Sequence, residues 1–142
     1  MGVQLNFRYF SDQYSTVSQG VFWLESDRWC PPKLPRVNVG LLLSEKLIPL
    51  SPQQRKENVF QLLKILLGEH KSIILENIQV LFLPSLALDI PALMVALARN
   101  RILCIVWPGR IEGQRLIYAQ PTLPEYAAYE VAKYVDTYVI TR

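Results

Sequence analysis

The sequence predicts an α/β domain in which helices flank a mostly parallel sheet, and three observations lead to this fold class. Short aliphatic runs recur between residues 36 and 142, as expected for strands covered on both faces. Segments with apolar residues at helical spacing separate these runs. Proline and glycine mark the boundaries between the two kinds of segment. Strands that alternate with helices in this way form layered α/β domains.

The composition fits one folded domain. The chain has 142 residues, of which 51% are hydrophobic, and its net charge is +3. This length supports a sizeable core, and the modest charge excludes an acidic disordered chain. No block of consecutive Lys or Arg occurs, so the charge alone does not indicate a nucleic-acid-binding protein. We divide the chain into a divergent, aromatic-rich N-terminal segment, residues 1–35, and an α/β domain, residues 36–142.

We expect no reactive or disulfide-bonded cysteine, no zinc site and no membrane contact. Cys30 and Cys104 are the only cysteines, and we expect both to be reduced and structural. His70 is the single histidine and has no partner at ligand spacing, so we expect it to cap a helix rather than bind zinc. No signal-like leader opens the chain, and Pro84 and Asp89 interrupt its most apolar region. We therefore expect a cytoplasmic protein without membrane contact.

The N-terminal segment contains one predicted strand, residues 21–24. Its aromatic residues are Phe7, Tyr9, Phe10, Tyr14, Phe22, Trp23 and Trp29. The prolines at positions 31, 32 and 35 exclude a regular helix before the next strand. Without a crossover helix, an antiparallel arrangement of these two strands is expected.

A strand, helix, strand unit follows. Residues 36–43 predict a strand that runs into an apolar turn, and Ser44 is placed to cap a short helical turn at 45–47. Ser51 as N-cap and Pro52 in the first helical position predict a long helix, and Gly68 is placed to end it. The next aliphatic run leads directly into Glu76 and is predicted to be a buried strand.

The remaining elements are shorter. Asp89 and Pro91 predict the start of a second helix. Proline and glycine at positions 108 and 109 stop the buried strand that follows it. The predicted ranges are a helix at 90–98, a strand at 102–107, a turn at 111–114, an extended piece at 115–119, a helix at 125–133 and a strand at 136–140.

Glu76 and Asn77 form the first candidate site. The carboxyl ends of parallel strands are where α/β sheets bind ligands. An aliphatic strand that ends in an acid is also the pattern of a Walker B strand, whose carboxylate helps hold the magnesium ion of a bound nucleotide. Many ordinary strands end in the same way, so both interpretations stand at this point.

Six segments of the sequence carry a resemblance to a known family: residues 38–47, 74–82, 98–101, 107–110, 116–119 and 124–126. Taken in order, they resemble BrxF, the small P-loop proteins of type 3 BREX phage-defence systems. The resemblance covers residues 36–142. It implies a P-loop ATPase-like fold, membership of a bacterial defence complex, and contact with partner proteins that handle DNA.

The sequence departs from that family where nucleotide chemistry takes place. A Walker A loop ends in Gly-Lys-Ser/Thr, and no glycine before the Glu76 strand is followed by Lys. Glu76 stands where Asp is usual, and Asn77 stands where many such ATPases have a catalytic carboxylate. An amide can orient a water molecule but cannot take its proton. We therefore expect no hydrolysis by this chain alone, and Mg²⁺ at Glu76 only if nucleotide binds.

Two further groups are candidates for a sensor or an arginine finger. Arg99, Asn100 and Arg101 precede a strand and could reach a neighbouring subunit's nucleotide, or they could be a solvated helix end. Trp107 and Arg110 follow that strand and could sense nucleotide or stack on a base, or Trp107 could plug the core beside a Pro-Gly turn. A DNA-binding face would require Arg99, Arg101, Arg110 and Arg115 on one side, together with Trp107 and Tyr118.

These observations predict a degenerate P-loop-like protein that needs no cofactor and works through protein contacts in a defence complex. The expected partners are other proteins of the defence system, and a homo-oligomer is an open alternative. A second interpretation is a weak ATPase completed by a partner, which would require ATP and Mg²⁺. A third is an accessory module that binds nucleic acid. Tyr126, Tyr129 and Tyr134 are expected to pack on the sheet.

Overall fold

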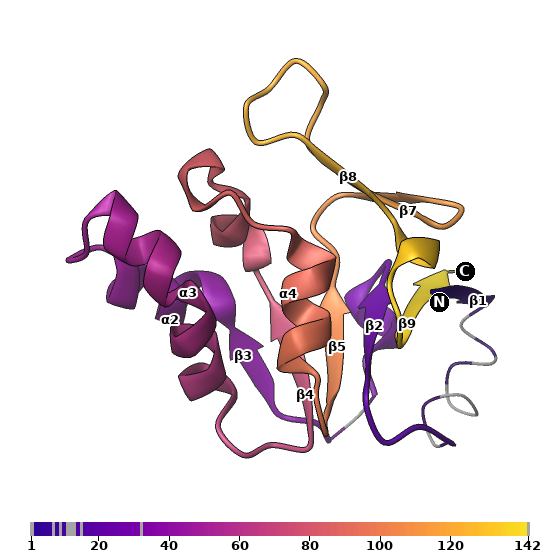
Figure 1. The fold of residues 1–142 in the computed structure, drawn as a ribbon. Coiled ribbons are helices and arrows are strands. Elements are labelled where there is room, and N and C mark those ends of the chain that lie inside the picture. The colour runs from indigo at the N-terminus through magenta and orange to yellow at the C-terminus, as the bar shows by residue number, and fades with distance from the viewer. Residues whose placement is uncertain are drawn as a thin grey trace.

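The computed structural model describes residues 2–6, 8, 10, 14, 16–31 and 33–141. Its main sheet has six strands in the order β1-β9-β2-β5-β4-β3, and each neighbouring pair is parallel (Figure 1). The predicted α/β class with a parallel sheet is therefore confirmed. The strands are β1 (Val3–Asn6), β2 (Gly20–Leu24), β3 (Arg36–Asn38), β4 (Ser72–Glu76), β5 (Ile102–Val106) and β9 (Thr137–Thr141). Phe7, Tyr9 and Pro32 lie outside the described residues.

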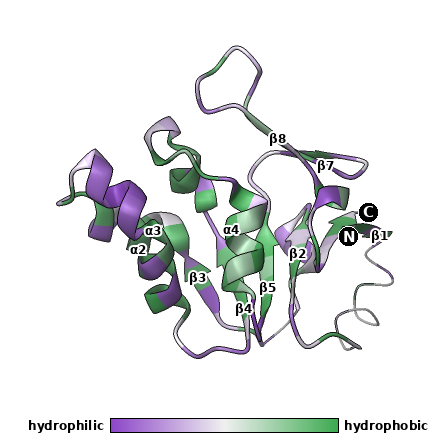
Figure 2. Ribbon diagram, in the orientation of Figure 1, coloured by the Kyte–Doolittle hydropathy of each residue, from purple (hydrophilic) through white to green (hydrophobic). Residues whose placement is uncertain are grey.

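Three helices pack against one face of this sheet: α2 (Val39–Leu47), α3 (Pro52–Leu67) and α4 (Ile90–Leu97). Side chains such as Leu43, Leu63 and Met94 share one buried cluster with Trp23 of β2 and Ile105 of β5. Strands β4 and β5 are hydrophobic along most of their length (Figure 2) because both of their faces are covered. Removing this apolar surface from water is the main force that holds the layers together.

Helices α3 and α4 begin at the residues that the sequence indicates, and α3 also ends where expected. The Ser51 hydroxyl accepts a hydrogen bond from the Gln54 amide, and the Gln54 side chain accepts one from the Ser51 amide, which completes a capping box. Gly68 ends α3 with φ 57°. Asp89 caps α4 through the Ala92 amide. His70 supplies its backbone amide to the Leu67 carbonyl at 3.4 Å, whereas a side-chain cap was expected.

The opposite face of the sheet has a separate core around Phe22, Ile74 and Cys104. Residues from the N-terminal part of the chain cover this second core. Strand β2 lies inside the sheet, and all five of its residues are buried. The described covering residues are Phe10, Tyr14, Val17, Trp29, Cys30 and Leu34.

Residues 39–47 form a helix, so the expected strand is confirmed only at 36–38 and the expected apolar turn was wrong, whereas the expected helical turn at 45–47 lies within α2. The side chain of Asn38 accepts a hydrogen bond from the Leu41 amide at 2.9 Å and starts α2 directly after β3. Val39, Leu43 and Leu47 then face the core at helical spacing. A local N-cap and tertiary packing override the strand preference of the aliphatic run.

The expected antiparallel arrangement of β2 and β3 was also wrong. The two strands run in the same direction because each is linked to β5 through parallel pairs. They are not neighbours in the sheet, since β5 and β4 lie between them. The connection across 25–35 is therefore a crossover, and among its described residues only the short 3₁₀ helix η2 (Asp27–Trp29) forms.

A second, antiparallel sheet follows β5. It consists of β6 (Arg110–Glu112), β7 (Arg115–Tyr118) and β8 (Ala127–Glu130), so the predicted helix at 125–133 was wrong. Residues 127–130 pair with β7, and only Val131–Lys133 adopt a helical turn, η5. This cross-strand pairing is a long-range effect that local spacing does not reveal.

Candidate functional site

The carboxyl ends of the parallel strands meet at one edge of the main sheet, which we call the carboxyl edge. Glu76 is the last residue of β4, and its register partner on β3 is Asn38. Glu25 follows β2, and Trp107 follows β5. Ligands of open α/β sheets bind at this kind of edge.

The carboxylate of Glu76 is already paired with a cation. Nη1 of Arg36 lies 3.4 Å from Oε2 of Glu76, and the two side chains are 45% and 32% exposed. Arg36 therefore supplies a positive charge beside the Glu76 carboxylate. An exposed pair of this kind adds at most about 1 kcal/mol to stability, so its main effect is on the local charge.

The crossover after β2 brings further groups beside this pair. Burial raises the pKa of the Cys30 thiol, the nearby Arg36 lowers it, and the charges of Asp27 and Glu76 raise it. The thiol is therefore protonated and unreactive at neutral pH. Cys104 is buried below it, and burial raises its pKa to about 12. Both cysteines are free, as predicted.

Asn77 serves the backbone geometry of the turn after β4. It adopts a left-handed conformation, φ 56° and ψ 51°, and leads into the 3₁₀ helix η3 (Ile78–Phe82). Asparagine tolerates this conformation better than most residues. Its carbonyl oxygen lies close to α2, where a Cβ atom on Gly40 would approach it to 2.8 Å. This backbone contact explains why residue 40 is a glycine.

Trp107 is a core residue. Its side chain is 3% exposed, and its indole Nε1 donates to the carbonyls of Arg110 at 3.1 Å and Ile117 at 3.0 Å. Its ring makes edge contacts with Trp23 at 5.5 Å and Phe82 at 5.4 Å. The buried ring cannot stack on a base or contact a nucleotide, so of the two interpretations the structure favours the core plug.

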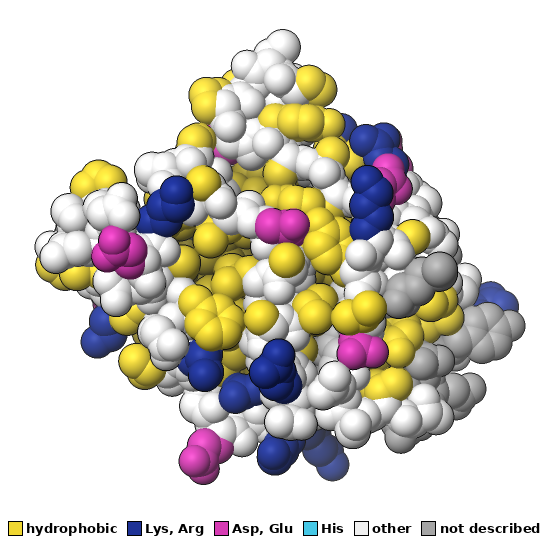
Figure 3. Space-filling model, viewed as in Figure 1, with side chains coloured by type: hydrophobic (Ala, Val, Ile, Leu, Met, Phe, Trp, Pro, Cys, Tyr) yellow, Lys and Arg dark blue, Asp and Glu magenta, His cyan; other side chains and the backbone are white. Residues whose placement is uncertain are grey.

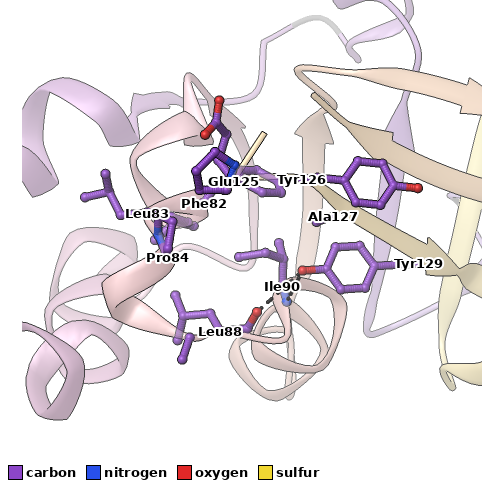
Figure 4. Close-up of a pocket in the computed structure, with 12 residues that line it drawn as sticks. Phe82, Leu83, Pro84, Leu88, Ile90, Glu125, Tyr126, Ala127 and Tyr129 are labelled. Atoms are coloured by element: carbon purple, nitrogen blue, oxygen red, sulfur yellow. Dashed lines mark hydrogen bonds between the residues drawn. The ribbon is translucent and has the colours of Figure 1, made fainter. Parts of the chain in front are cut away.

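A hollow lined by apolar and aromatic side chains and by Glu125 opens at the carboxyl edge, between η3 and the segment that leads into β8 (Figure 4). Its volume is about 170 Å³. Phe82, Pro84 and Leu88 form one wall, and Tyr126 and Tyr129 form the other. The Tyr129 hydroxyl donates to the Leu88 carbonyl at 3.4 Å and accepts from the Ile90 amide at 3.5 Å, which fixes one tyrosine in the wall.

A second tyrosine is held near the hollow by a carboxylate. The Tyr134 hydroxyl lies 3.0 and 3.1 Å from the two oxygens of Asp89. Burial and this hydrogen bond raise the pKa of Tyr134 from 10.0 to about 12. Burial likewise raises the pKa of Tyr129.

These shifts predict loss of stability in alkali. Between pH 10 and about 12 the folded chain keeps the Tyr134 proton that the unfolded chain has lost, so the free energy of unfolding falls as the pH rises through this interval. Urea denaturation across the interval should show a shallower fall for Tyr134→Phe than for the wild type. Equal slopes for the two proteins would contradict this assignment.

The other arginine candidates lie elsewhere. Arg99, Asn100 and Arg101 lie before β5, at the amino end of the sheet, whereas Arg110 lies beyond its carboxyl end. Arg115 is paired with Glu130 at 3.0 Å. The four arginines therefore do not share one face with Trp107, and Tyr118 is stacked on Phe82 at 3.9 Å. The condition set for the DNA-binding face is not met.

Sequence reasoning missed Arg36 and Asp27 at the carboxyl edge. Arg36 reaches Glu76 only because β3 and β4 pair in parallel with Arg36 opposite Ile74. Residues two apart on one strand share a face, so this register would have placed Arg36 beside Glu76. The register of β3 against β4 depends on pairing between distant residues, so the local sequence does not reveal it.

Comparisons with protein-family models, curated proteins and solved structures gave no match to this chain. Within the described residues, no group of three or more His, Cys, Asp or Glu side chains is arranged to hold a metal ion. No helix in this part of the chain has both the length and the hydrophobicity that a membrane crossing requires.

Proposed function

We propose that this chain is a P-loop-like protein that does not hydrolyse ATP and works through protein contacts in a BREX-type defence complex. The observation that carries the proposal is the Arg36–Glu76 pair at the carboxyl edge. An internal guanidinium beside the Walker B-like acid makes a bound metal ion unnecessary there and opposes its binding through like charge.

The strand order supports the P-loop part of the proposal. β5 lies between β2 and β4, as a sensor strand lies between the phosphate-loop strand and the Walker B strand of many P-loop ATPases. In such proteins a helix N-terminus follows the phosphate-loop strand and binds phosphate through its amides. Here Glu25 and Asp27 follow β2, and their negative charge opposes phosphate binding.

The size of the hollow supports a protein contact. Small-molecule sites enclose roughly 300–1,000 Å³, and the hollow of about 170 Å³ falls below that range. Its apolar and aromatic walls suit one apolar side chain of a partner protein. Leu83 on its rim is 44% exposed, which extends the apolar surface outward.

The first test is calorimetry with Mg-ATP on the purified chain. We expect no heat of binding and no rise in Tm at millimolar nucleotide, because no cradle for phosphate follows β2. The Glu76→Gln variant should behave as the wild type does in both assays. Binding that is present in the wild type and lost in Glu76→Gln would contradict the proposal.

The alternative of a partner-completed ATPase makes a different prediction. ATP hydrolysis would then appear only when the chain is mixed with its partner proteins, and it would vanish in Glu76→Gln. The same result would show that the Glu76 carboxylate is required for hydrolysis in the complex.

A further inference from the structure

Positive charge gathers at the other edge of the main sheet, where the strands begin. Lys71 directly precedes β4, and Arg101 directly precedes β5. Lys64 lies in the last turn of α3, and Arg99 follows α4. Figure 3 shows dark-blue side chains collected in the lower part of the molecule, below these helices. These residues come from two stretches of sequence, 64–71 and 99–101, and the parallel topology brings them to one edge.

Two adjoining hollows lie at this edge, and a third adjoins them along α4 toward Ala92 and Tyr134. The first has a volume of about 380 Å³ and the second about 410 Å³, and they share Arg99, Asn100 and Arg101. The third, of about 480 Å³, shares Ala96 and Arg99 with the second. We call this row the amino-edge track. Its cationic lining residues are Lys64, Lys71, Arg99, Arg101 and Lys133.

The amino-edge track accounts for the charge imbalance of the chain. Its lining includes two acids, Glu69 and Asp136, against five cations, which gives it a net charge of +3. The whole chain has the same net charge, +3. The remainder of the molecule is therefore balanced, and an approaching polyanion is attracted to this edge rather than to the surface in general.

The cations of the track are not neutralised by the protein. The ion pairs within the described residues are Arg36–Glu76 and Arg115–Glu130, and neither involves the track. Asp136 accepts a hydrogen bond from Gln19 at 3.1 Å, and the same glutamine accepts one from the Asn100 amide at 3.1 Å. Nη1 of Arg101 is buried and has no acceptor among the described residues. A buried donor of this kind is costly unless an acceptor binds to it.

We propose that the amino-edge track binds the phosphate groups of a nucleic-acid backbone. A row of three hollows suits an extended polyanion better than a single phosphate. Arg and Lys side chains are the usual partners of backbone phosphates. Phe60 and Leu97 give the second hollow an apolar wall against which a sugar or a base can lie. This binding is separate from the protein contact proposed at the carboxyl edge, so each can fail alone.

The test uses fluorescence anisotropy with a labelled DNA duplex and with the corresponding single strand, from about 50 to 200 mM salt. The wild type should bind, with an affinity that falls as salt rises. Lys71→Gln combined with Arg99→Gln should weaken binding about tenfold or more and reduce the salt slope by about 2, because each lost phosphate contact removes about one unit. Both residues are exposed, so a thermal-shift control should show that the variant folds.

A matched control separates the track from general charge attraction. Arg28→Gln combined with Arg110→Gln removes the same charge from exposed residues beyond the carboxyl ends of β2 and β5. This variant should bind DNA as the wild type does. An equal loss in both variants would overturn the proposal, as would failure of the wild type to bind either DNA. Binding of inorganic phosphate without binding of DNA would overturn the assignment to nucleic acid.

Discussion

Trp107→Ala is expected to lower the free energy of unfolding by about 3–5 kcal/mol, the usual cost of removing a large buried aromatic side chain. The ring fills the junction between the main sheet and the antiparallel sheet, in contact with Trp23 and Phe82. Its removal would also leave the carbonyls of Arg110 and Ile117 without their indole donor. Urea denaturation of the variant and the wild type measures this difference.

Two further variants make this prediction specific. Trp107→Phe keeps most of the ring but loses the indole donor, so its free energy of unfolding should lie between those of the wild type and Trp107→Ala. Arg110→Ala removes an exposed side chain and should change stability by no more than about 0.5 kcal/mol. A loss below about 1 kcal/mol in Trp107→Ala would contradict the core assignment and restore a sensor or base-stacking role.

Residues of the segments at 74–82 and 107–110 serve the fold of this chain. Trp107 closes the core, and Asn77 makes a left-handed turn. Gly109 lies directly against the Ile117 carbonyl, where a Cβ atom would clash.

Local signals predicted the elements that carry their own start and stop residues. Helix α3 has Ser51 and Gly68 at its ends, and α4 has Asp89. The errors fall where distant pairing decides the structure. Tyr126, Tyr129 and Tyr134 lie at near-helical spacing, yet residues 127–130 pair with β7. The strand at 21–24 was predicted, but its parallel pairing with β5 and β9 inside the sheet depends on distant residues.

The candidate site was predictable only in part. The position of Glu76 at the end of a buried strand followed from its aliphatic run, and the structure confirms it. The hypothesis that Arg99 and Arg101 share a face with Arg110 was wrong. Arg99 and Arg101 precede β5, whereas Arg110 follows it. In a parallel sheet, residues that precede the strands lie at one edge, and residues that follow the strands lie at the opposite edge. That rule, applied to Lys71 and Arg101, would have indicated the amino-edge track.

The second large effect is expected at the hollow of the carboxyl edge. Leu83 and Tyr126 lie on opposite sides of it (Figure 4), and Leu83→Asp combined with Tyr126→Asp would place two charges in a dry protein contact. Residues that anchor an interface contribute about 2 kcal/mol or more, so partner binding should weaken about 30-fold or more. The measurement is co-purification of the tagged chain with proteins of the same defence locus, followed by titration of the protein retained.

The control variant carries the same two charges on the outer surface of α2 and α3. Leu41 and Ile65 are 59% and 71% exposed and do not line the hollow, so Leu41→Asp combined with Ile65→Asp should keep the partner. If this variant loses the partner while the hollow variant keeps it, the contact lies on the helices instead. If no protein of the locus is retained by the wild type, the proposed role in a defence complex is wrong. If only the hollow variant loses the partner and its Tm is preserved, the hollow is the contact. The two variants carry the same added charge and differ only in where that charge is placed.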